Sequence, residues 1–215
     1  MNVLRLALPA LLLAFPLTAH AVPIIASPTG LAGPKTTLTF DEVVLPKGTP
    51  VINQYSAFGV AFAGLFYNPQ PGFSTFNLSP PDLGNFPVVD DEDLVVINPI
   101  SIIFSSPLTA AAFATVTNEA LSTFTAFLGN SPVESFAAPT DTTSPNNFFG
   151  FTGITFDRID VNVASFASLG NEAILIDNLQ RPAALTAVSE PGVPGLLLLS
   201  LGAMGLLRRK TSYFR

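Results

Sequence analysis

The sequence predicts an all-β domain, a β-sandwich or jelly roll, flanked by a targeting segment at each end. Short stretches rich in Val, Ile, Phe and Thr recur between clusters of Pro, Gly, Asn and Asp, a pattern typical of strands separated by turns. No segment between the apolar ends keeps the periodicity of an amphipathic helix. The roughly 168 residues between those ends suffice for one domain with its own core.

The expected strands alternate apolar and polar residues over short distances. In one of them the apolar residues stand at even positions up to Phe156 and at odd positions from Ile159 onwards. A β-bulge at Asp157 and Arg158 is the simplest cause of that change of phase. In chain order we expect strands at 36–40, 51–55, 59–62, 94–97, 100–104, 110–116, 122–128, 133–136, 148–151, 154–163 and 173–179.

Residues 64–88 contain five prolines and several asparagines, which predicts a long surface loop rather than core. Aromatic residues in such a loop would be exposed, and long aromatic loops are often binding elements. The alternative is that these rings are needed in the core, as Phe residues at strand positions are. The candidate ligand contacts are Tyr55, Phe66, Tyr67, Phe73 and Phe76.

The N-terminus has the layout of a secretory signal peptide. Arg5 precedes an apolar stretch at 6–17, and Ala19 and Ala21 form an A-x-A cleavage site. We therefore expect signal peptidase to remove residues 1–21. The alternative is an uncleaved membrane anchor.

The C-terminus has three consecutive parts. A Ser-Glu-Pro-Gly box precedes an apolar run at 193–207, which is followed by a basic end at 208–215. Positive charge after an apolar segment holds that end in the cytoplasm, so we expect a single short transmembrane helix. The alternative is a buried core helix, because 15 residues fall short of the roughly 20 that span a bilayer. The sorting residues are Ser189, Glu190, Pro191, Gly192, Arg208, Arg209 and Lys210.

This tail resembles the PEP-CTERM sorting signal of Gram-negative, exopolysaccharide-producing bacteria, which the protease exosortase processes. Glu190, Pro191 and Gly192 match that signal, whereas Ser189 stands where Pro is commoner. The resemblance implies export through the inner membrane, a transient membrane anchor, and a final place on the cell surface or in the extracellular matrix. The expected domains are 1–21, 22–188 and 189–215.

The central domain resembles a recurrent ectodomain of PEP-CTERM proteins, a galactose-binding-like jelly roll. The residues that match are the opening segment 38–62 and the closing segments 151–159 and 176–179. In such a jelly roll the first and last strands lie near each other, so Asp41, Glu42 and Asp177 are candidate ligands of a structural calcium ion, which prefers oxygen ligands. The alternative is that these acids cap turns.

Charge and absent residue types exclude several functions. Residues 22–189 hold four basic and fourteen acidic side chains, a net charge of −10, and a nucleic-acid partner would need a basic stripe. The chain has no Cys, and its one His, His20, lies in the expected signal peptide. Zinc-thiolate sites, thiol catalysis and His-based catalysis are therefore excluded for the mature domain.

The sequence predicts a non-enzymatic exported protein of the cell surface or exopolysaccharide matrix, with carbohydrate binding as its candidate activity. Two other functions stay open. One is a carbohydrate-active hydrolase with a pair of carboxylates, although such enzymes usually line their subsites with Trp, which this chain lacks. The other is a purely structural matrix module. The expected partners are signal peptidase, exosortase and a polysaccharide, with no nucleic acid.

Overall fold

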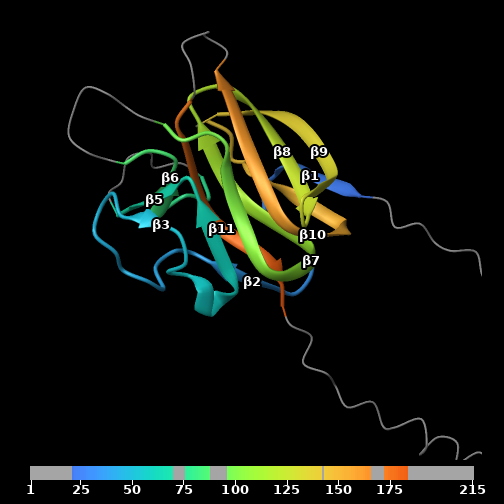
Figure 1. Cartoon of the computed structure of the whole chain (residues 1–215). Helices are drawn as coiled ribbons and strands as arrows, with labels where there is room; N and C mark the ends of the chain where they lie inside the picture. Colours follow the sequence, from blue (N-terminus) through green and yellow to red (C-terminus); the bar gives the residue numbers. More distant parts are fainter. Residues whose placement is uncertain (1–20, 70–75, 88–95, 142, 166–171, 184–215) are drawn as a thin grey trace, which may run out of the picture. The chain divides into compact units, whose positions relative to one another are not determined.

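The structure is a computed structural model that describes residues 21–69, 76–87, 96–141, 143–165 and 172–183. The chain divides into two units, Met1–Pro182 and Ala183–Arg215, and every described strand belongs to the first (Figure 1). The strands are β1 Val22–Ser27, β2 Lys35–Leu38, β3 Pro50–Val51, β4 Val60–Ala63, β5 Leu65–Asn68, β6 Asp82–Gly84, β7 Ile100–Thr117, β8 Ala120–Leu128, β9 Ser131–Thr140, β10 Phe148–Ser165 and β11 Ile174–Pro182, with a 3-10 helix η1 at Ser56–Phe58.

The described strands form one large antiparallel sheet. Its main path runs β3-β5-β6-β11-β7-β10-β8-β9, while β1 pairs with β10, β2 with β11 and β4 with β7. All of these pairings are antiparallel. The prediction of an all-β domain is therefore confirmed. The jelly-roll connectivity stays a prediction.

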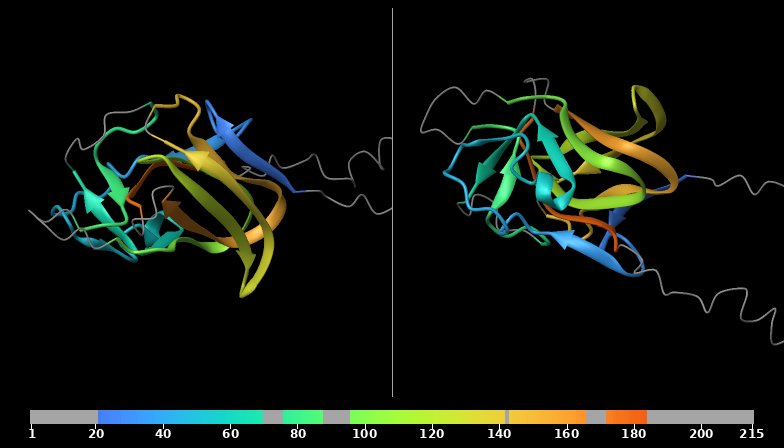
Figure 2. Two further views of the ribbon diagram at one scale, coloured as in Figure 1. Left: turned by 90° about the horizontal axis from the view of Figure 1, so that it is seen from above. Right: turned by 60° about the horizontal axis from the view of Figure 1, so that its bottom comes forward.

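The two longest strands, β7 and β10, curve strongly along their length (Figure 2). Their curvature brings two parts of the sheet face to face across the core. The ring of Phe124 on β8 stacks on that of Phe149 in the first half of β10, with centroids 5.0 Å apart. Phe136 on β9 contacts Phe151 at 5.2 Å. These contacts make the two faces of the core one packed unit.

The change of phase that the sequence predicts lies within β10. The pairing of β10 with β7 shifts register between Phe156 and Arg158. Buried side chains change from Phe156 on one side of the shift to Ile159 and Val161 on the other. The predicted change of phase is confirmed and coincides with a register shift, although between the flanking pairs the extra residues lie on β7, from Ile103 to Leu108.

A second apolar cluster lies apart from the main core. Ala112, Ala114 and Leu175 belong to it, together with Leu31 and Leu78 from the connecting segments. Gly150 of β10 lies opposite Ala112 in the pairing with β7. A Cβ at position 150 would lie 2.0 Å from the carbonyl oxygen of Ala111. Both clusters and the whole described sheet lie within residues 22–182. This part of the chain therefore has the core it needs to fold by itself.

Several predicted strands are confirmed and several are wrong. The predicted pairs 100–104 with 110–116, and 148–151 with 154–163, are each one long strand, β7 and β10. The predicted strand 51–55 is limited to Pro50–Val51, because the chain then turns into η1. Val96 and Ile97 are not in a strand, and 94–95 lie outside the described residues.

The predicted loop 64–88 is wrong in part, because it contains β5 and β6. Both strands pair in the sheet, β5 with β3 and β6 with β11. In the part of the chain that the structure describes, no helix is long and apolar enough to cross a membrane. The expected helix 193–207, the other sorting residues and Ala19 lie outside the described residues.

Candidate functional site

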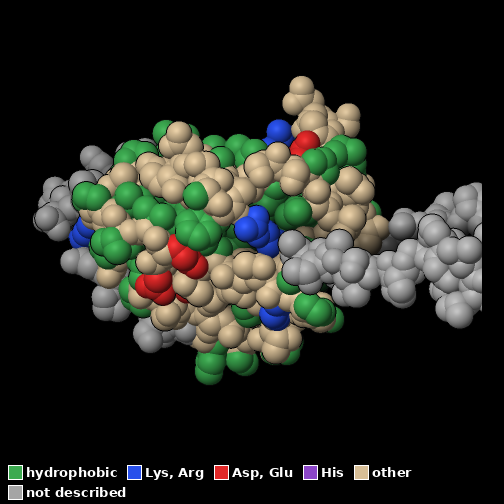
Figure 3. Space-filling view, turned by 90° about the horizontal axis from the view of Figure 1, so that it is seen from below, with side chains coloured by type: hydrophobic (Ala, Val, Ile, Leu, Met, Phe, Trp, Pro, Cys, Tyr) green, Lys and Arg blue, Asp and Glu red, His purple; other side chains and the backbone are tan. Residues whose placement is uncertain are grey.

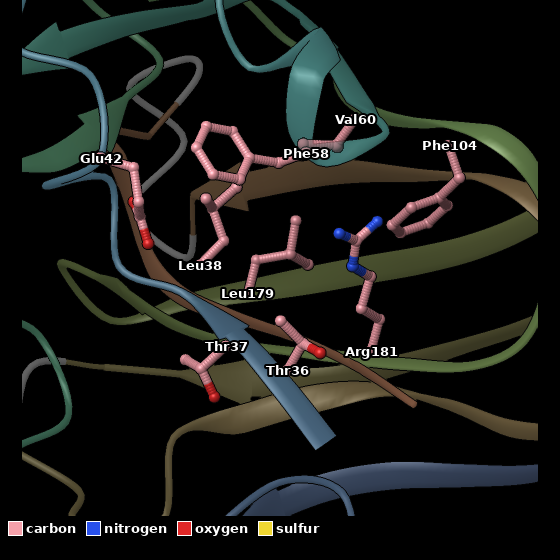
Figure 4. A pocket seen from close by; sticks show the side chains of 9 residues that line it. All are labelled: Thr36, Thr37, Leu38, Glu42, Phe58, Val60, Phe104, Leu179 and Arg181. Atoms are coloured by element: carbon pink, nitrogen blue, oxygen red, sulfur yellow. The ribbon is translucent and has the colours of Figure 1, made fainter. Parts of the chain in front are cut away.

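A cavity of about 250 Å³ opens between β2, β11, η1 and the start of β4 (Figure 4). Its floor consists of four buried apolar side chains, Leu38, Val60, Phe104 and Leu179, which belong to the main core. The other lining residues are Thr36, Thr37, Glu42, Phe58 and Arg181. The cavity therefore combines an apolar floor with a few polar groups, the usual composition of a small-molecule site.

Strand register explains how these side chains meet. In the β2–β11 pair, Leu38 lies opposite Leu179 and Thr36 lies opposite Arg181. In the β4–β7 pair, Val60 lies opposite Phe104. Directly opposite residues of an antiparallel pair share one face of the sheet. Each strand pair thus presents two neighbouring side chains to the cavity.

The two charged lining residues lie at opposite ends of the cavity, with Leu38 and Leu179 between them (Figure 4). Oε1 of Glu42 accepts hydrogen bonds from the backbone N and Oγ1 of Thr39, at 3.1 and 3.4 Å. The guanidinium of Arg181 has no hydrogen bond or ion pair with any described residue. The cavity therefore holds a separated negative and positive charge rather than an ion pair.

The position of the Arg181 guanidinium depends on Gly59, the residue between η1 and β4. A Cβ at Gly59 would lie 2.8 Å from Nη1 of Arg181 and 3.1 Å from Oγ of Ser105. Gly59 also has a φ of +74°, which an L side chain rarely adopts. Glycine at this position therefore serves both the turn and the close approach of the guanidinium.

Charged side chains are sparse on one face of the molecule. Figure 3 shows this face, where hydrophobic side chains are frequent and the basic side chains stand singly. The other arginine of the domain, Arg158, is already engaged. Its Nε lies 3.0 Å from Oδ1 of Asp160, and its guanidinium lies 4.1 Å from the ring centroid of Phe127. Arg181 thus differs from Arg158 in having its guanidinium available.

The structure corrects the predicted ligand contacts in part. Tyr55 and Tyr67 are only 0% and 2% exposed and belong to the main core, so a ligand cannot reach either ring face. The Tyr55 hydroxyl donates to the carbonyl oxygen of Phe40 at 3.0 Å, and burial raises the pKa of this hydroxyl further above its ordinary value. Phe76 is 59% exposed. Phe73 lies outside the described residues.

Phe66 lines a different cavity, of about 290 Å³. That cavity is bordered by apolar residues, among them Ile52 and Ile97, and by the backbone of Gly64. Its lining contains no charged or hydroxyl-bearing side chain, so it offers little to orient a polar ligand. The cavity beside Arg181 is the better candidate site.

The three predicted calcium ligands do not form a metal site together. Among the residues that the structure describes, no group of three His, Cys, Asp or Glu side chains is placed to hold a metal ion. Asp41 and Glu42 are exposed, whereas Asp177 is 1% exposed. The two oxygens of Asp177 accept hydrogen bonds from the backbone N of Ser79 and of Asn178. Asp177 lies within β11 and bonds one neighbouring and one distant backbone amide, so it is not the local turn cap of the alternative, and calcium binding stays a prediction.

Asp177 has a buried carboxylate neighbour that the sequence did not indicate. In the β6–β11 pair, Leu83 lies opposite Ile176. The next residues in this register are Asp82 and Asp177, which therefore lie side by side, and Asp82 is 0% exposed. Oδ1 of Asp82 accepts a hydrogen bond from Nδ2 of Asn68 at 2.9 Å, whereas buried Oδ2 has no partner among the described residues. Burial raises the pKa of Asp82 to about 6. Burial, together with the charges of Asp82 and Asp41, raises that of Asp177 to about 7.

Sequence reasoning missed Phe58, Thr36 and Arg181 as site residues. A signal for Arg181 was available, because residues 22–189 contain only two arginines and the guanidinium is a common binding group for carboxylate and phosphate. No comparable signal exists for Phe58, which reaches the cavity through the turn of η1. Its role depends on tertiary packing.

Comparisons with known proteins do not assign the chain to a family. No protein-family model matches it, and no curated protein matches it. Among solved structures it is similar to a mutant of the family 29 carbohydrate-binding module CBM29-2 complexed with mannohexaose, at 15% identity and a TM-score of 0.37, over 70% of this chain and 92% of that one. It is also similar to another carbohydrate-binding module of family 29, at 12% identity and a TM-score of 0.36, over 75% and 88%. Likenesses this weak carry no inference about this chain.

Proposed function

We propose that this chain is an exported, non-catalytic protein of the cell surface or exopolysaccharide matrix, and that its β domain binds a sugar in the cavity beside Arg181. The observation that carries the binding proposal is the composition of that cavity. Its floor is apolar, one wall is the partly buried ring of Phe58, and hydroxyl, carboxylate and guanidinium groups surround it.

A sugar ring has apolar C–H faces and a polar edge. The faces are suited to Phe58 and the leucine floor, while the hydroxyls are suited to Thr36 and Glu42. At about 250 Å³ the cavity is slightly smaller than the ~300–1,000 Å³ of sites for drug-sized ligands. We therefore propose that it holds a single sugar residue, such as a chain end or a side branch.

The rival proposal of a carboxylate-pair hydrolase has less support. Such an enzyme needs two carboxylates that face a substrate. The cavity is lined by one carboxylate, that of Glu42. The neighbouring pair Asp82 and Asp177 is buried within the sheet, at 0% and 1% exposure.

Phe58→Ala is expected to weaken sugar binding by residues 22–188 about 3- to 10-fold, since an aromatic contact contributes about 0.5–1.5 kcal/mol beyond its buried area. A glycan array would identify the bound sugar, and calorimetry would give the affinities. Phe76→Ala is the matched control, because Phe76 is exposed and does not line this cavity. If Phe76→Ala weakened sugar binding and Phe58→Ala did not, the sugar site would lie near Phe76 instead of in this cavity. Binding of no glycan would leave a purely structural module.

The sorting proposal predicts that the mature protein lacks both ends. Intact-mass measurement on protein from the exporting cell is expected to show the loss of residues 1–21 and of the segment after about Glu190. Substitution of Arg208, Arg209 and Lys210 by Gln is expected to reduce tail processing, because the positive end fixes the orientation of the apolar segment. Full-length protein in the soluble cytoplasm would contradict the sorting proposal and leave the sugar proposal intact.

A further inference from the structure

We propose that the cavity selects an acidic sugar, a uronate, whose C6 carboxylate binds the guanidinium of Arg181. This inference deepens the proposed sugar-binding function and rests on it. It starts from one observation: a positive charge stands in a cavity with an apolar floor and has no partner among the described residues. A cation in such a place is suited to an anionic ligand, because a hydrogen bond to a charged group strengthens where water is excluded.

The shape of the arginine side chain favours one kind of anionic group in the ligand, a carboxylate. The planar guanidinium presents parallel N–H donors that match the two oxygens of a carboxylate. Gly59 leaves room for this group, since any Cβ at position 59 would lie 2.8 Å from Nη1. The guanidinium therefore lies against the backbone of Gly59 at the edge of the cavity. A defined place favours bidentate binding of a planar anion.

The opposite end of the cavity gives the ligand a direction. The Glu42 carboxylate lies at the end away from Arg181 (Figure 4), where it repels a second negative charge and accepts hydrogen bonds from hydroxyl groups. Leu38 and Leu179 lie between the two charged residues. A uronate has this distribution of groups: one carboxylate, an apolar ring face and hydroxyls on the far side.

The test compares pairs of sugars that differ in one group. Residues 22–188 would be titrated with the methyl glycosides of glucuronate and galacturonate and with those of glucose and galactose. At least one uronate is expected to bind about 10- to 100-fold more tightly than its neutral counterpart, about the range of one charge-assisted hydrogen bond. Arg181→Gln is expected to abolish that preference. Arg181→Lys is expected to retain only part of it, since the charge remains but the fork is lost.

Lys47→Gln is the matched control, because it removes one positive charge outside the cavity lining. It is expected to keep the preference, and thermal melting of each variant checks that the fold is intact. Equal binding of uronate and neutral sugar, or a preference that survives Arg181→Gln, would overturn this inference while leaving the sugar-binding function in place. Binding of none of the four glycosides or of any glycan on an array would overturn both.

Discussion

Residues 22–188 are expected to be several kcal/mol less stable at about pH 7.5 than at about pH 4.5, the opposite of ordinary acid denaturation. The cause is the buried pair Asp82 and Asp177, whose pKa values are raised from 3.8 to about 6 and about 7. Between 3.8 and these values the folded state binds more protons than the unfolded state. Stability therefore falls as pH rises through this window.

The size of the effect follows from about 1.36 kcal/mol per pKa unit. The pKa values of Asp82 and Asp177 are raised by about two and three units, and because the two carboxyls interact, their effect belongs to the pair and amounts to several kcal/mol. This effect is fully present below about pH 4 and is lost once pH exceeds the folded-state values. Urea titrations at a series of pH values measure the free energy of unfolding directly.

Asp82→Asn is expected to remove its share of the pH dependence while keeping an oxygen to accept from Asn68. Asp177→Asn is also expected to flatten the curve, but from a lower starting stability, because one oxygen cannot replace both acceptors of the Ser79 and Asn178 amides. Glu119→Gln, which removes an exposed carboxylate, controls for net charge. A wild-type curve that rises with pH between 4.5 and 7.5 would contradict the raised pKa values.

The same titrations in calcium and in excess chelator test the calcium prediction. Calcium binds the charged carboxylate, so an ion held by Asp177 would lower the pKa of this group and remove the loss of stability near pH 7. At one hundred times its dissociation constant the ion would add about 2.7 kcal/mol. Magnesium controls for general screening of the acidic domain. Identical curves in all three buffers would leave Asp177 as a cap of backbone amides.

Phe156→Ala is expected to lower the free energy of unfolding by about 3–5 kcal/mol, the usual cost of emptying a buried aromatic site. Phe156 is 0% exposed beside the register shift between β10 and β7. Its ring contacts those of Phe104 on β7 and Phe151 on β10, with centroids 5.9 and 6.0 Å away. The substitution therefore removes packing contacts with both strands.

Thr123→Ala on β8 is the control for this prediction. Thr123 is partly exposed between the buried Ser122 and Phe124, so its side chain lies on the outer face of the sheet. It is expected to change the free energy of unfolding by less than about 0.5 kcal/mol. A cost below about 1 kcal/mol for Phe156→Ala would mean that the core collapses around the missing ring.

Strands with a clear alternation were predictable from the sequence. Ser122, Phe124 and Ala126 of β8 are buried, as a period of two requires. The change of phase near Asp157 was predictable for the same reason, since it can be read from the local sequence, and a register shift accompanies it. Such patterns are local, because burial of one face fixes the residue types along it.

The short strands β5 and β6 were not predictable. Prolines and asparagines are frequent in the segment that contains them, and these residues favour turns. Both strands form because distant partners, β3 and β11, supply their hydrogen bonds. The same pairing buries Tyr67 and places Asp82 beside Asp177. Propensity is weaker than tertiary pairing in strands this short.

The sequence by itself determined the all-β class, the acidic balance of the domain and the types of catalysis that its residues exclude. Tertiary structure alone decided which side chains meet. Arg181, Thr36, Phe58 and Glu42 lie on separate elements of the chain and reach one cavity only through the β2–β11 pairing and the turn at Gly59. Composition and periodicity are local properties of a sequence, whereas a binding site depends on contacts between residues far apart in it.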